Sequence, residues 1–462
     1  MTSNGVLEYG RDHVVIFPYM AKGHTIPLLQ FATALSVHHK NLHITLLITP
    51  ANRAFARSRL PSSVELVELS FPSYPPLPAG VESTDALPCP SMYPAFLHAT
   101  ALLRDPFAAF LSLLPSRPLA LVSDFFLGFT HRVAADAGVP RVVFHGMSCF
   151  AMAVCKALIV NPPQPAGAAF RVPGMPEGVE ITVEEIPDMV ARFADADDPV
   201  TRFFVDNDDG SDVRSWGVLV NSFAALDADY VAPFEAFYYE PGARGWLVGP
   251  LFLAAGDMTT ELIDKELDPE GCLAWLDERA YSQPGSVIYV SFGTQAHVSD
   301  AQLDETLHGL VQSGHPFLWV VRSDTWSPPV DVGSSSRIVR GWVPQRSVLA
   351  HKAVGGFVSH CGWNSVMESL VAGKPILAWP MIAEQHLNAK HVVDIIGAGI
   401  RMVAKKDGVV ERTEIEEKVK MLMDTDVEVA KKSADQGCLG ATNGGGGGKR
   451  WRNLTPCIAE AY

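Results

Sequence analysis

The sequence has no Cys-x-x-Cys pair, and its seven cysteines are widely spaced and odd in number. This spacing indicates neither a zinc site nor a disulfide framework, and it fits a reducing compartment. No apolar run reaches the roughly 18 residues that a membrane-spanning helix needs. The N-terminal residues are polar and lack the apolar core of a signal peptide. We therefore expect a cytoplasmic protein without a membrane span.

Positive charge is scarce as well. Lys and Arg number 36 against 51 Asp and Glu, which gives a formal net charge of −15. Such a chain is a poor general partner for nucleic acid or an anionic membrane, although local donors could still bind an anionic ligand. The length of 462 residues and the 48% hydrophobic content predict a globular protein with two large domains.

Short apolar runs alternate with helix-like stretches in both halves of the chain. The predicted strands are 13–19, 43–50, 64–71, 119–124, 141–146, 286–293, 317–322, 354–360 and 376–380. The predicted helices are 25–38, 129–138, 300–313, 364–372, 385–396 and 413–423. Near-continuous apolar strands that alternate with helices indicate parallel sheets covered on both faces.

The order of these elements predicts an α/β protein with two doubly wound, Rossmann-like domains. Because ligands bind beyond the carboxyl ends of such strands, we expect the domains to face each other across a cleft and bind two substrates there. The predicted boundaries are an N-terminal domain at 1–245, a linker at 246–267 and a C-terminal domain at 268–448. Residues 449–462, an amphipathic stretch after a glycine run, are predicted to form a C-terminal helix that returns to the N-terminal domain.

The segment His-Cys-Gly-Trp-Asn-Ser at 360–365 lies where a predicted strand meets a helix. Gly362 lets a ligand approach the backbone closely, and Asn364 and Ser365 begin the helix. Free N–H groups and the helix dipole favour an anion at that point, so a diphosphate fits there. His360 can add a hydrogen bond to a phosphate oxygen.

Residues around this junction suit the remaining parts of a nucleotide sugar. Trp342 offers a flat face for a uracil ring, and the Val343 backbone can bind the edge of that ring. Glu368, one helical turn beyond Asn364, accepts hydrogen bonds and suits ribose hydroxyls, which Gln345 can also reach. The adjacent pair Glu384-Gln385 supplies acceptors and donors for the hydroxyls of the sugar.

All of these residues lie in one 44-residue segment, 342–385, which resembles the signature box of plant secondary-product UDP-glycosyltransferases without a gap. The resemblance implies the GT-B fold, a UDP-sugar as co-substrate, no other cofactor and no metal. It also implies that Trp363 belongs to the donor site and that Thr294 contacts phosphate, although Thr294 could equally be a turn residue at a strand end. In this family the last helix returns to the N-terminal domain, and the glycine-rich segment 424–448 departs from the usual pattern.

The same resemblance assigns a catalytic pair. His24 stands at the family's catalytic-histidine position, and histidine is suited to removing a proton from a hydroxyl near neutral pH. Asp124 ends a predicted strand and would orient His24 and stabilise its charge. From the residues alone, His24 could instead be a helix cap or a buried hydrogen-bonding residue, and Asp124 could be an N-cap.

Aromatic and sulfur-containing side chains gather in loops after the N-terminal strands, and they could line an apolar acceptor pocket. The proposed lining residues are Met92, Phe96, Phe125, Phe126, His145, Met147 and Phe150. Packing in the core is the alternative for each of them. Four Asp-x-Asp triplets, which begin at Asp195, Asp206, Asp227 and Asp424, are interpreted as solvated charge and not as metal ligands.

Together these features predict a monomeric, inverting O-glycosyltransferase. By resemblance, the donor is UDP-glucose and the acceptor is a small lipophilic plant phenolic such as a flavonoid. One alternative is an inactive protein that binds UDP-sugar or the acceptor; the intact His24, Asp124 and donor segment argue against it. The other is a nucleotide-dependent oxidoreductase; the absence of a Gly-x-Gly-x-x-Gly loop argues against that.

Overall fold

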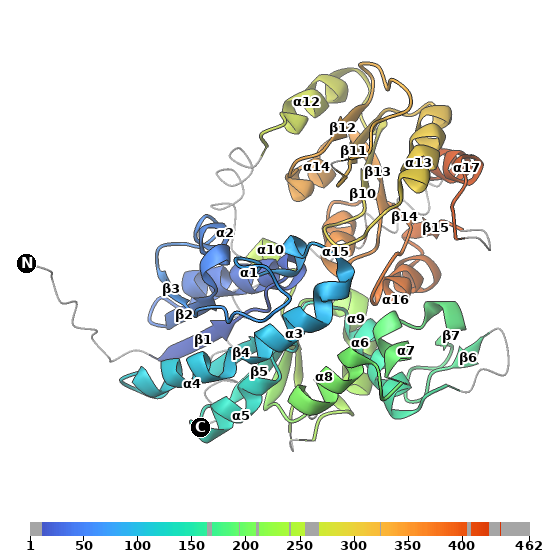
Figure 1. Cartoon of the computed structure of the whole chain (residues 1–462). Helices are drawn as coiled ribbons and strands as arrows, with labels where there is room; N and C mark the ends of the chain where they lie inside the picture. Colours follow the sequence, from blue (N-terminus) through green and yellow to red (C-terminus); the bar gives the residue numbers. More distant parts are fainter. Residues whose placement is uncertain are drawn as a thin grey trace, which may run out of the picture.

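A computed structural model describes residues 12–163, 169–193, 195–208, 212–239, 242–254, 268–323, 325–403, 408–424 and 435. Two α/β domains are each built around a parallel sheet (Figure 1). In Figure 1 the N-terminal domain, coloured blue to green, lies below the C-terminal domain, coloured yellow to red. This arrangement confirms the predicted fold class, two doubly wound domains of the GT-B type.

The N-terminal sheet has seven parallel strands in the order β3-β2-β1-β4-β5-β8-β9. They are β1 His13–Phe17, β2 His43–Ile48, β3 Val64–Glu68, β4 Ala120–Asp124, β5 Arg141–His145, β8 Gly217–Val220 and β9 Gly245–Leu247. The strand order reverses between β1 and β4, where Val14 lies beside Ala120. Such a switch point opens a crevice at the carboxyl ends of the two strands.

Helices cover both faces of this sheet because alternate strand residues point in opposite directions. Val14 and Ile16 of β1 pack in the core cluster that contains α1, whereas Val15 and Phe17 pack with α3, α4 and α5. The helices of the domain are α1 Lys22–His38, α2 Arg53–Arg57, α3 Tyr93–Ala101, α4 Arg104–Leu113, α5 Phe129–Asp136, α6 Cys149–Val160, α7 Asp188–Arg192, α8 Pro199–Asp208, α9 Ala224–Glu235 and α10 Leu251–Ala254. Two short strands, β6 Phe170–Arg171 and β7 Glu180–Ile181, form a separate antiparallel ribbon.

The C-terminal sheet has six parallel strands in the order β12-β11-β10-β13-β14-β15. They are β10 Val287–Ser291, β11 Phe317–Val320, β12 Arg337–Val339, β13 Val354–Ser359, β14 Ile376–Ala378 and β15 Gly399–Arg401. The helices are α12 Cys272–Ser282, α13 Asp300–Ser313, α14 Gln345–Ala350, α15 Trp363–Val371, α16 Gln385–Lys390, the π-helical segment His391–Ile396 and α17 Arg412–Asp424. None of the helices within the described ranges is long and apolar enough to cross a membrane.

Every strand and helix predicted within the described residues is present, but several elements were not predicted, among them the helices α3, α4, α6, α8, α9 and α12. The strands β8, β9, β12 and β15 have only three or four residues each, so they carry too little periodic pattern to stand out from loops. The predicted helix at 385–396 divides into α16 and the π-helical segment that follows it. Gly397 ends this segment with a φ of 72°, a backbone conformation that glycine adopts without strain.

The predicted domain boundary at residue 245 is wrong. Strand β9 continues to Leu247, and Leu251 and Ala254 of α10 are buried in the same core cluster as α1. The N-terminal domain therefore extends to Ala254, and the first nine residues of the predicted linker belong to it. The rest of that linker, 255–267, and the predicted terminal helix at 449–462 lie outside the described residues.

Candidate active site

The carboxyl ends of the two sheets border one cleft of about 1070 Å³. Its N-terminal wall includes residues after β1, β4 and β5, and its C-terminal wall includes residues after β10, β11, β12, β13 and β14. The predicted residues that line it are His24, Thr294, Trp342, Val343, Gln345, His360, Gly362, Trp363, Asn364, Ser365, Glu368, Glu384 and Gln385. The structure thus brings the whole predicted donor set and the predicted base to one cavity.

His24 and Asp124 form a hydrogen-bonded pair although a hundred residues separate them. His24 Nδ1 lies 2.9 Å from Asp124 Oδ2, and Asp124 Oδ1 accepts a hydrogen bond from the Phe126 backbone N–H at 3.0 Å. Asp124 is fully buried, whereas His24 is part-exposed to the cleft. Burial alone would lower the pKa of His24, but the charge and hydrogen bond of Asp124, with the charge of Glu384, outweigh it and raise that pKa.

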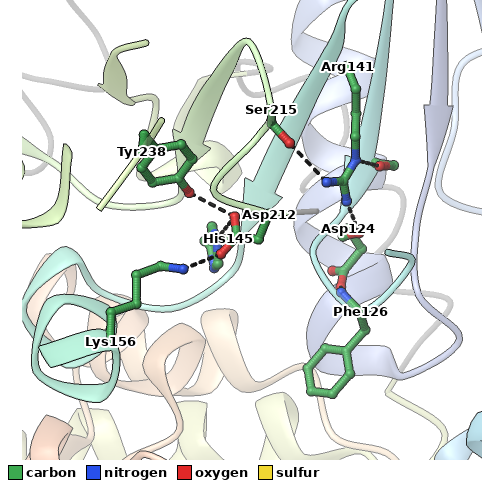
Figure 2. Close-up of polar contacts among 9 residues, drawn as sticks. Asp124, Phe126, Arg141, His145, Lys156, Asp212, Ser215 and Tyr238 are labelled. Atoms are coloured by element: carbon green, nitrogen blue, oxygen red, sulfur yellow. Dashed lines mark hydrogen bonds and ion pairs between the residues drawn. The ribbon is translucent and has the colours of Figure 1, made fainter. Parts of the chain in front are cut away.

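Arg141 of β5 supports the end of β4 that carries Asp124. Its guanidinium group donates to Ser123 Oγ at 2.8 Å, to Ser215 Oγ at 2.9 Å and to the Asp124 backbone oxygen at 3.2 Å. Figure 2 shows this group above Asp124, on the side opposite Phe126. These bonds fix the backbone at the carboxyl end of the strand, so the Asp124 carboxylate has one orientation toward His24.

The structure contradicts the prediction that His145 lines the acceptor pocket. His145 is fully buried, and its Nε2 lies 3.1 Å from Asp212 Oδ1, which also accepts a hydrogen bond from the Tyr238 hydroxyl at 2.8 Å. Lys156 Nζ lies 2.5 Å from the other Asp212 oxygen. The side chains of His145, Tyr238 and Lys156 all point toward Asp212 in Figure 2. Burial opposes the ionised Asp212, but the charges of Lys156 and His145 hold the pKa of Asp212 well below its usual range. His145 therefore belongs to a buried polar network.

Phe96 and Phe150 were also predicted to line the pocket, and both are fully buried in the core. Phe96 lies between the rings of Tyr19 and Phe71, at centroid distances of 6.0 and 5.6 Å. Phe150 packs against Tyr230 of α9 and His391 of the C-terminal domain. Both were predicted to lie in loops, but Phe96 lies in α3 and Phe150 in α6, and the direction of each side chain depends on tertiary contacts that the local sequence does not contain.

Two further predicted lining residues, Met92 and Phe125, lie beside the cleft and not on its wall. Phe125 stacks on the buried His145 ring at 4.5 Å. The apolar part of the N-terminal wall is formed instead by Tyr19, Leu87, Tyr93, Phe126, Met147, Met189 and Val200. Of these, only Phe126 and Met147 were foreseen.

The acidic triplets differ among themselves. Asp195 and Asp197 are exposed, as predicted, but Asp227 is fully buried. Asp227 accepts hydrogen bonds from the backbone N–H groups of Cys149 and Phe150 at 2.9 and 3.2 Å, so it satisfies the first amides of α6. Within the described ranges, no group of three or more His, Cys, Asp and Glu side chains is arranged to hold a metal ion.

The junction from β13 to α15 places the residues of the predicted anion site at the N-terminus of a helix. Cys361 has a φ of 63°, and Gly362 is the residue before the helix. Asn364 Nδ2 donates to the Gly23 backbone oxygen at 2.8 Å, and Asn364 Oδ1 accepts from Asn221 at 3.3 Å. Asn364 therefore ties the donor helix to the residue beside His24, a link between the domains that the sequence did not reveal.

His360 stands between two glycines that leave no room for a side chain. A Cβ atom on Gly293 would lie 2.5 Å from His360 Nε2, and one on Gly362 would lie 2.6 Å from it. Burial lowers the pKa of His360 to about 4, so the ring stays neutral at physiological pH. Thr294 follows Gly293 into the cleft, where a phosphate contact and a turn role are both compatible with its position.

Gln345 connects the residues expected to hold the ribose. Its Nε2 lies 2.9 Å from Ser365 Oγ and 2.8 Å from Glu368 Oε2, while its Oε1 accepts from the Tyr289 hydroxyl at 3.3 Å. This arrangement orients the Glu368 carboxylate toward the cleft. Trp342 and Val343 precede this group on the same wall.

The pair Glu384-Gln385 lies at the start of α16. Gln385 Oε1 accepts hydrogen bonds from the backbone N–H groups of Met381 and Ile382, both at 3.0 Å, so this oxygen is already satisfied. Burial raises the pKa of Glu384, although a hydrogen bond from Asn388 and the charge of His24 oppose that change. Gln385 is therefore left with its amide nitrogen for a sugar hydroxyl.

Trp363 borders the cleft, but its indole does not face it. Its Nε1 donates to the Asn221 backbone oxygen at 2.8 Å, and its ring stacks on His391. Only 3% of the residue is exposed. The expected donor contact of Trp363 is thus limited to its backbone, and its side chain joins the two domains.

Comparison with known proteins agrees with this geometry. Residues 12–253 match the family model "Glycosyltransferase, N-terminal domain", and residues 251–430 match "UDP-glucoronosyl and UDP-glucosyl transferase". The chain is 35% identical to UDP-glycosyltransferase 90A1 of Arabidopsis thaliana, over 97% of this chain and 96% of that protein. It is 35% identical to the flavonol 3-O-glucosyltransferase UGT89B1 of the same plant, over 88% and 86% of the two chains.

Solved structures lead to the same family. A Glycyrrhiza uralensis UGT73P12 structure with glycyrrhetinic acid 3-O-monoglucuronide has a TM-score of 0.84 and 29% identity, covering 98% of this chain and 96% of that one. Phytolacca americana UGT2 with UDP-2fluoro-glucose and pterostilbene has a TM-score of 0.78 and 27% identity, covering 97% and 99%. With its cleft, its paired histidine and its two matching family models, the chain belongs to the plant UDP-glycosyltransferases, enzymes that use a UDP-sugar as co-substrate.

Proposed function

We propose that this enzyme transfers glucose from UDP-glucose to a phenolic hydroxyl of a small lipophilic acceptor, with inversion at the anomeric carbon. The observation that carries the proposal is that the His24–Asp124 pair and the N-terminus of α15 face one cleft from opposite domains. A base and a leaving-group site on opposite sides of a sugar are the parts that a single in-line displacement requires.

His24 acts as the general base in this proposal. His24 Nδ1 is hydrogen-bonded to the Asp124 carboxylate, so His24 Nε2 is the nitrogen that accepts the proton of the acceptor hydroxyl. The acceptor oxygen forms a bond to the anomeric carbon while the bond from that carbon to the β-phosphate oxygen of UDP breaks. The electron pair of the broken bond stays on UDP, and the proton stays on His24 until it passes to solvent. Asp124 stabilises the imidazolium ion that forms.

The charge that develops on UDP is met by neutral donors. The first N–H groups of α15 have no partner within the helix and are available to a diphosphate at the helix N-terminus, where the helix dipole favours negative charge. His360, whose low pKa keeps it neutral, adds one hydrogen bond. We propose that these groups stabilise the leaving diphosphate without a metal ion.

The choice of substrates rests on the relatives and on the cleft wall. One relative is named as a flavonol 3-O-glucosyltransferase, and one similar structure holds UDP-2fluoro-glucose with pterostilbene. Tyr93, Phe126 and Met147 give this chain an apolar wall next to His24, which suits a flat aromatic acceptor. Gln385 supports glucose, because its free amide can donate to a sugar hydroxyl.

The direct test offers the purified chain UDP-glucose, UDP-galactose and UDP-glucuronate with a panel of flavonols, stilbenes and simple phenols. Mass spectrometry should detect a hexoside on at least one phenol, and NMR of the product should show the β-anomer. A chain that binds UDP without forming any glycoside across the panel would be a binding protein instead.

Two donor-side measurements refine the proposal. Gln385→His should shift the ratio of turnover toward UDP-galactose, because it replaces the amide that is expected to contact the sugar. Activity should survive excess EDTA; complete loss on chelation that Mn²⁺ restores would contradict the metal-free leaving-group site.

We also propose that the enzyme works as a cytoplasmic monomer. The cleft is complete within one chain, and the five cysteines in the described ranges are free thiols, which fits a reducing compartment. Light scattering of the purified protein and imaging of a fluorescent fusion test these two points. A stable dimer with altered activity on dilution would contradict the first.

A further inference from the structure

Two cations of the N-terminal domain stand over the ring of Trp342 in the C-terminal domain. Lys22 Nζ lies 5.7 Å from the Trp342 ring centroid, and Arg59 Cζ lies 5.9 Å from it. All three residues line the cleft. We call Lys22 and Arg59 the basic wall.

Helices α1 and α2 hold the basic wall in place. Lys22 is the first residue of α1 and pairs with Asp85 at 2.6 Å. Arg59 follows α2, and its guanidinium carbon lies only 3.9 Å from the Phe55 ring centroid, with Nη1 donating to the Phe55 backbone oxygen at 3.1 Å. The Arg59 guanidinium group is thus in van der Waals contact with the Phe55 ring, whereas it lies too far from the Trp342 ring for such contact.

Arg59 is not neutralised by an acidic partner among the residues that the structure describes. Its nearest polar contacts are the Phe55 carbonyl and Ser58 Oγ, and burial lowers the pKa of its guanidinium group. A half-buried cation with spare N–H donors, held above an aromatic ring, suits a ligand that is flat and carries carbonyl oxygens.

The spacing matches such a ligand. A planar base in contact with a ring on one side and a cation on the other needs about 7 Å, twice the usual contact distance, so the two walls would separate by about 1 Å on binding. Arg and Lys stems are flexible enough to make that adjustment. The uracil ring has the required shape and two carbonyl oxygens that accept hydrogen bonds.

We propose that the basic wall is the N-terminal half of the uracil site, so that the nucleobase lies between Trp342 and the cations of Lys22 and Arg59. Donor binding is then shared by the two domains, and the base is held from both sides. This inference rests on the proposed function, because it locates the UDP of the proposed donor.

The test compares Arg59→Met with Arg53→Met by calorimetric titration of UDP and, separately, of uridine. Arg53 is the first residue of α2, is exposed and pairs with Glu68 at 2.6 Å, so it is a control from the neighbouring helix. We expect Arg59→Met to weaken the binding of both UDP and uridine by about 3- to 30-fold, the usual contribution of a cation over an aromatic ring. The unfolding temperature of Arg59→Met should stay close to that of wild type, and Arg53→Met should bind both ligands normally.

Three results would overturn the inference. Unchanged UDP affinity in Arg59→Met would remove Arg59 from the site. A loss of UDP affinity with normal uridine affinity would assign Arg59 to the phosphates and not to the base. An equal loss in Arg53→Met would show a general charge effect. If wild type itself fails to bind UDP, the proposed function fails, and that outcome is distinct from the other three.

Discussion

His24 of the N-terminal domain and His360 of the C-terminal domain both line the cleft, and the two have opposite surroundings. His24, in the first turn of α1, has a buried carboxylate 2.9 Å from its ring and a raised pKa. His360, directly after β13, is enclosed by glycines, and its Nδ1 has no partner in the described part of the chain. Burial lowers its pKa to about 4. Desolvation acts on both rings, so the presence of Asp124 decides the difference.

This contrast assigns separate chemistry to the two walls. A histidine whose charged form is stabilised can accept a proton during the reaction, whereas a histidine held neutral can only exchange hydrogen bonds. The N-terminal wall thus suits activation of the acceptor, and the C-terminal wall suits a leaving group that is already charged. The following predictions test whether that division holds.

The largest effect is expected for His24→Ala. Loss of a general base should lower kcat by about 10²–10⁴-fold. Acceptors with a more acidic phenol need less help with proton removal and should lose less. Steady-state rates with a series of substituted phenols measure this, and His131→Ala, on a histidine of the same domain outside the cleft, is the control. A loss that does not depend on the acidity of the phenol would argue against a base.

Asp124→Asn should give the next largest loss, about 10²-fold or more, because the amide keeps the shape but not the charge that stabilises imidazolium. The double variant with His24→Ala should be no slower than His24→Ala alone, since the two residues act as a unit. Rates of the single and double variants measure this coupling. Multiplied losses in the double variant would show two independent roles.

A smaller effect is expected on the other wall. His360→Ala should weaken UDP binding by roughly 10-fold, the usual worth of one hydrogen bond to a charged group. The KM for the acceptor should change little, because His360 lies among the donor residues. Calorimetry with UDP measures the first value and initial rates measure the second. An equal rise of the Kd for UDP and the KM for the acceptor would mean that the substitution disturbs the whole cleft.

The smallest expected effect is a shift of the pH profile. The raised pKa of His24 predicts that kcat/KM falls as the pH drops through a value above 6.5, because the protonated ring cannot act as a base. In Asp124→Asn the main cause of that raised pKa is absent while burial still lowers it, so the acid limb should move to lower pH. Rates measured across the acid range in both proteins check the direction. If the acid limb of Asp124→Asn stays at the pH of wild type, that limb does not report the protonation of His24.

The two walls also differ in how far the sequence predicted them. Most of the donor wall comes from one continuous segment, 342–385. In it each strand is followed directly by a helix whose first residues line the cleft, so the local sequence was enough to predict this wall. The apolar acceptor wall depends on which side chains of α3 and α6 point inward. Tyr93 reaches the cleft from the first turn of α3, whereas Phe96, one turn later, lies under Tyr19. The sequence analysis predicted neither helix, and even a located helix would leave its rotation undetermined.

The same reason explains the missed contacts between domains. Asn364 was predicted to begin a helix and does so, but its bond to Gly23 joins positions 341 residues apart. Neither Arg59 nor Lys22 was predicted as a site residue; only the folded chain brings them over Trp342. By contrast, the family resemblance paired His24 with Asp124 correctly, and the two lie at the carboxyl ends of the neighbouring parallel strands β1 and β4.

The most direct measurement combines turnover and UDP affinity in one variant, His24→Ala. If the base lies on one wall and the leaving-group site on the other, turnover should fall by about 10²–10⁴-fold while calorimetric UDP affinity stays within about twofold of wild type. Near-normal turnover on an ordinary phenol, or a parallel loss of UDP binding in a protein that remains folded, would contradict the account.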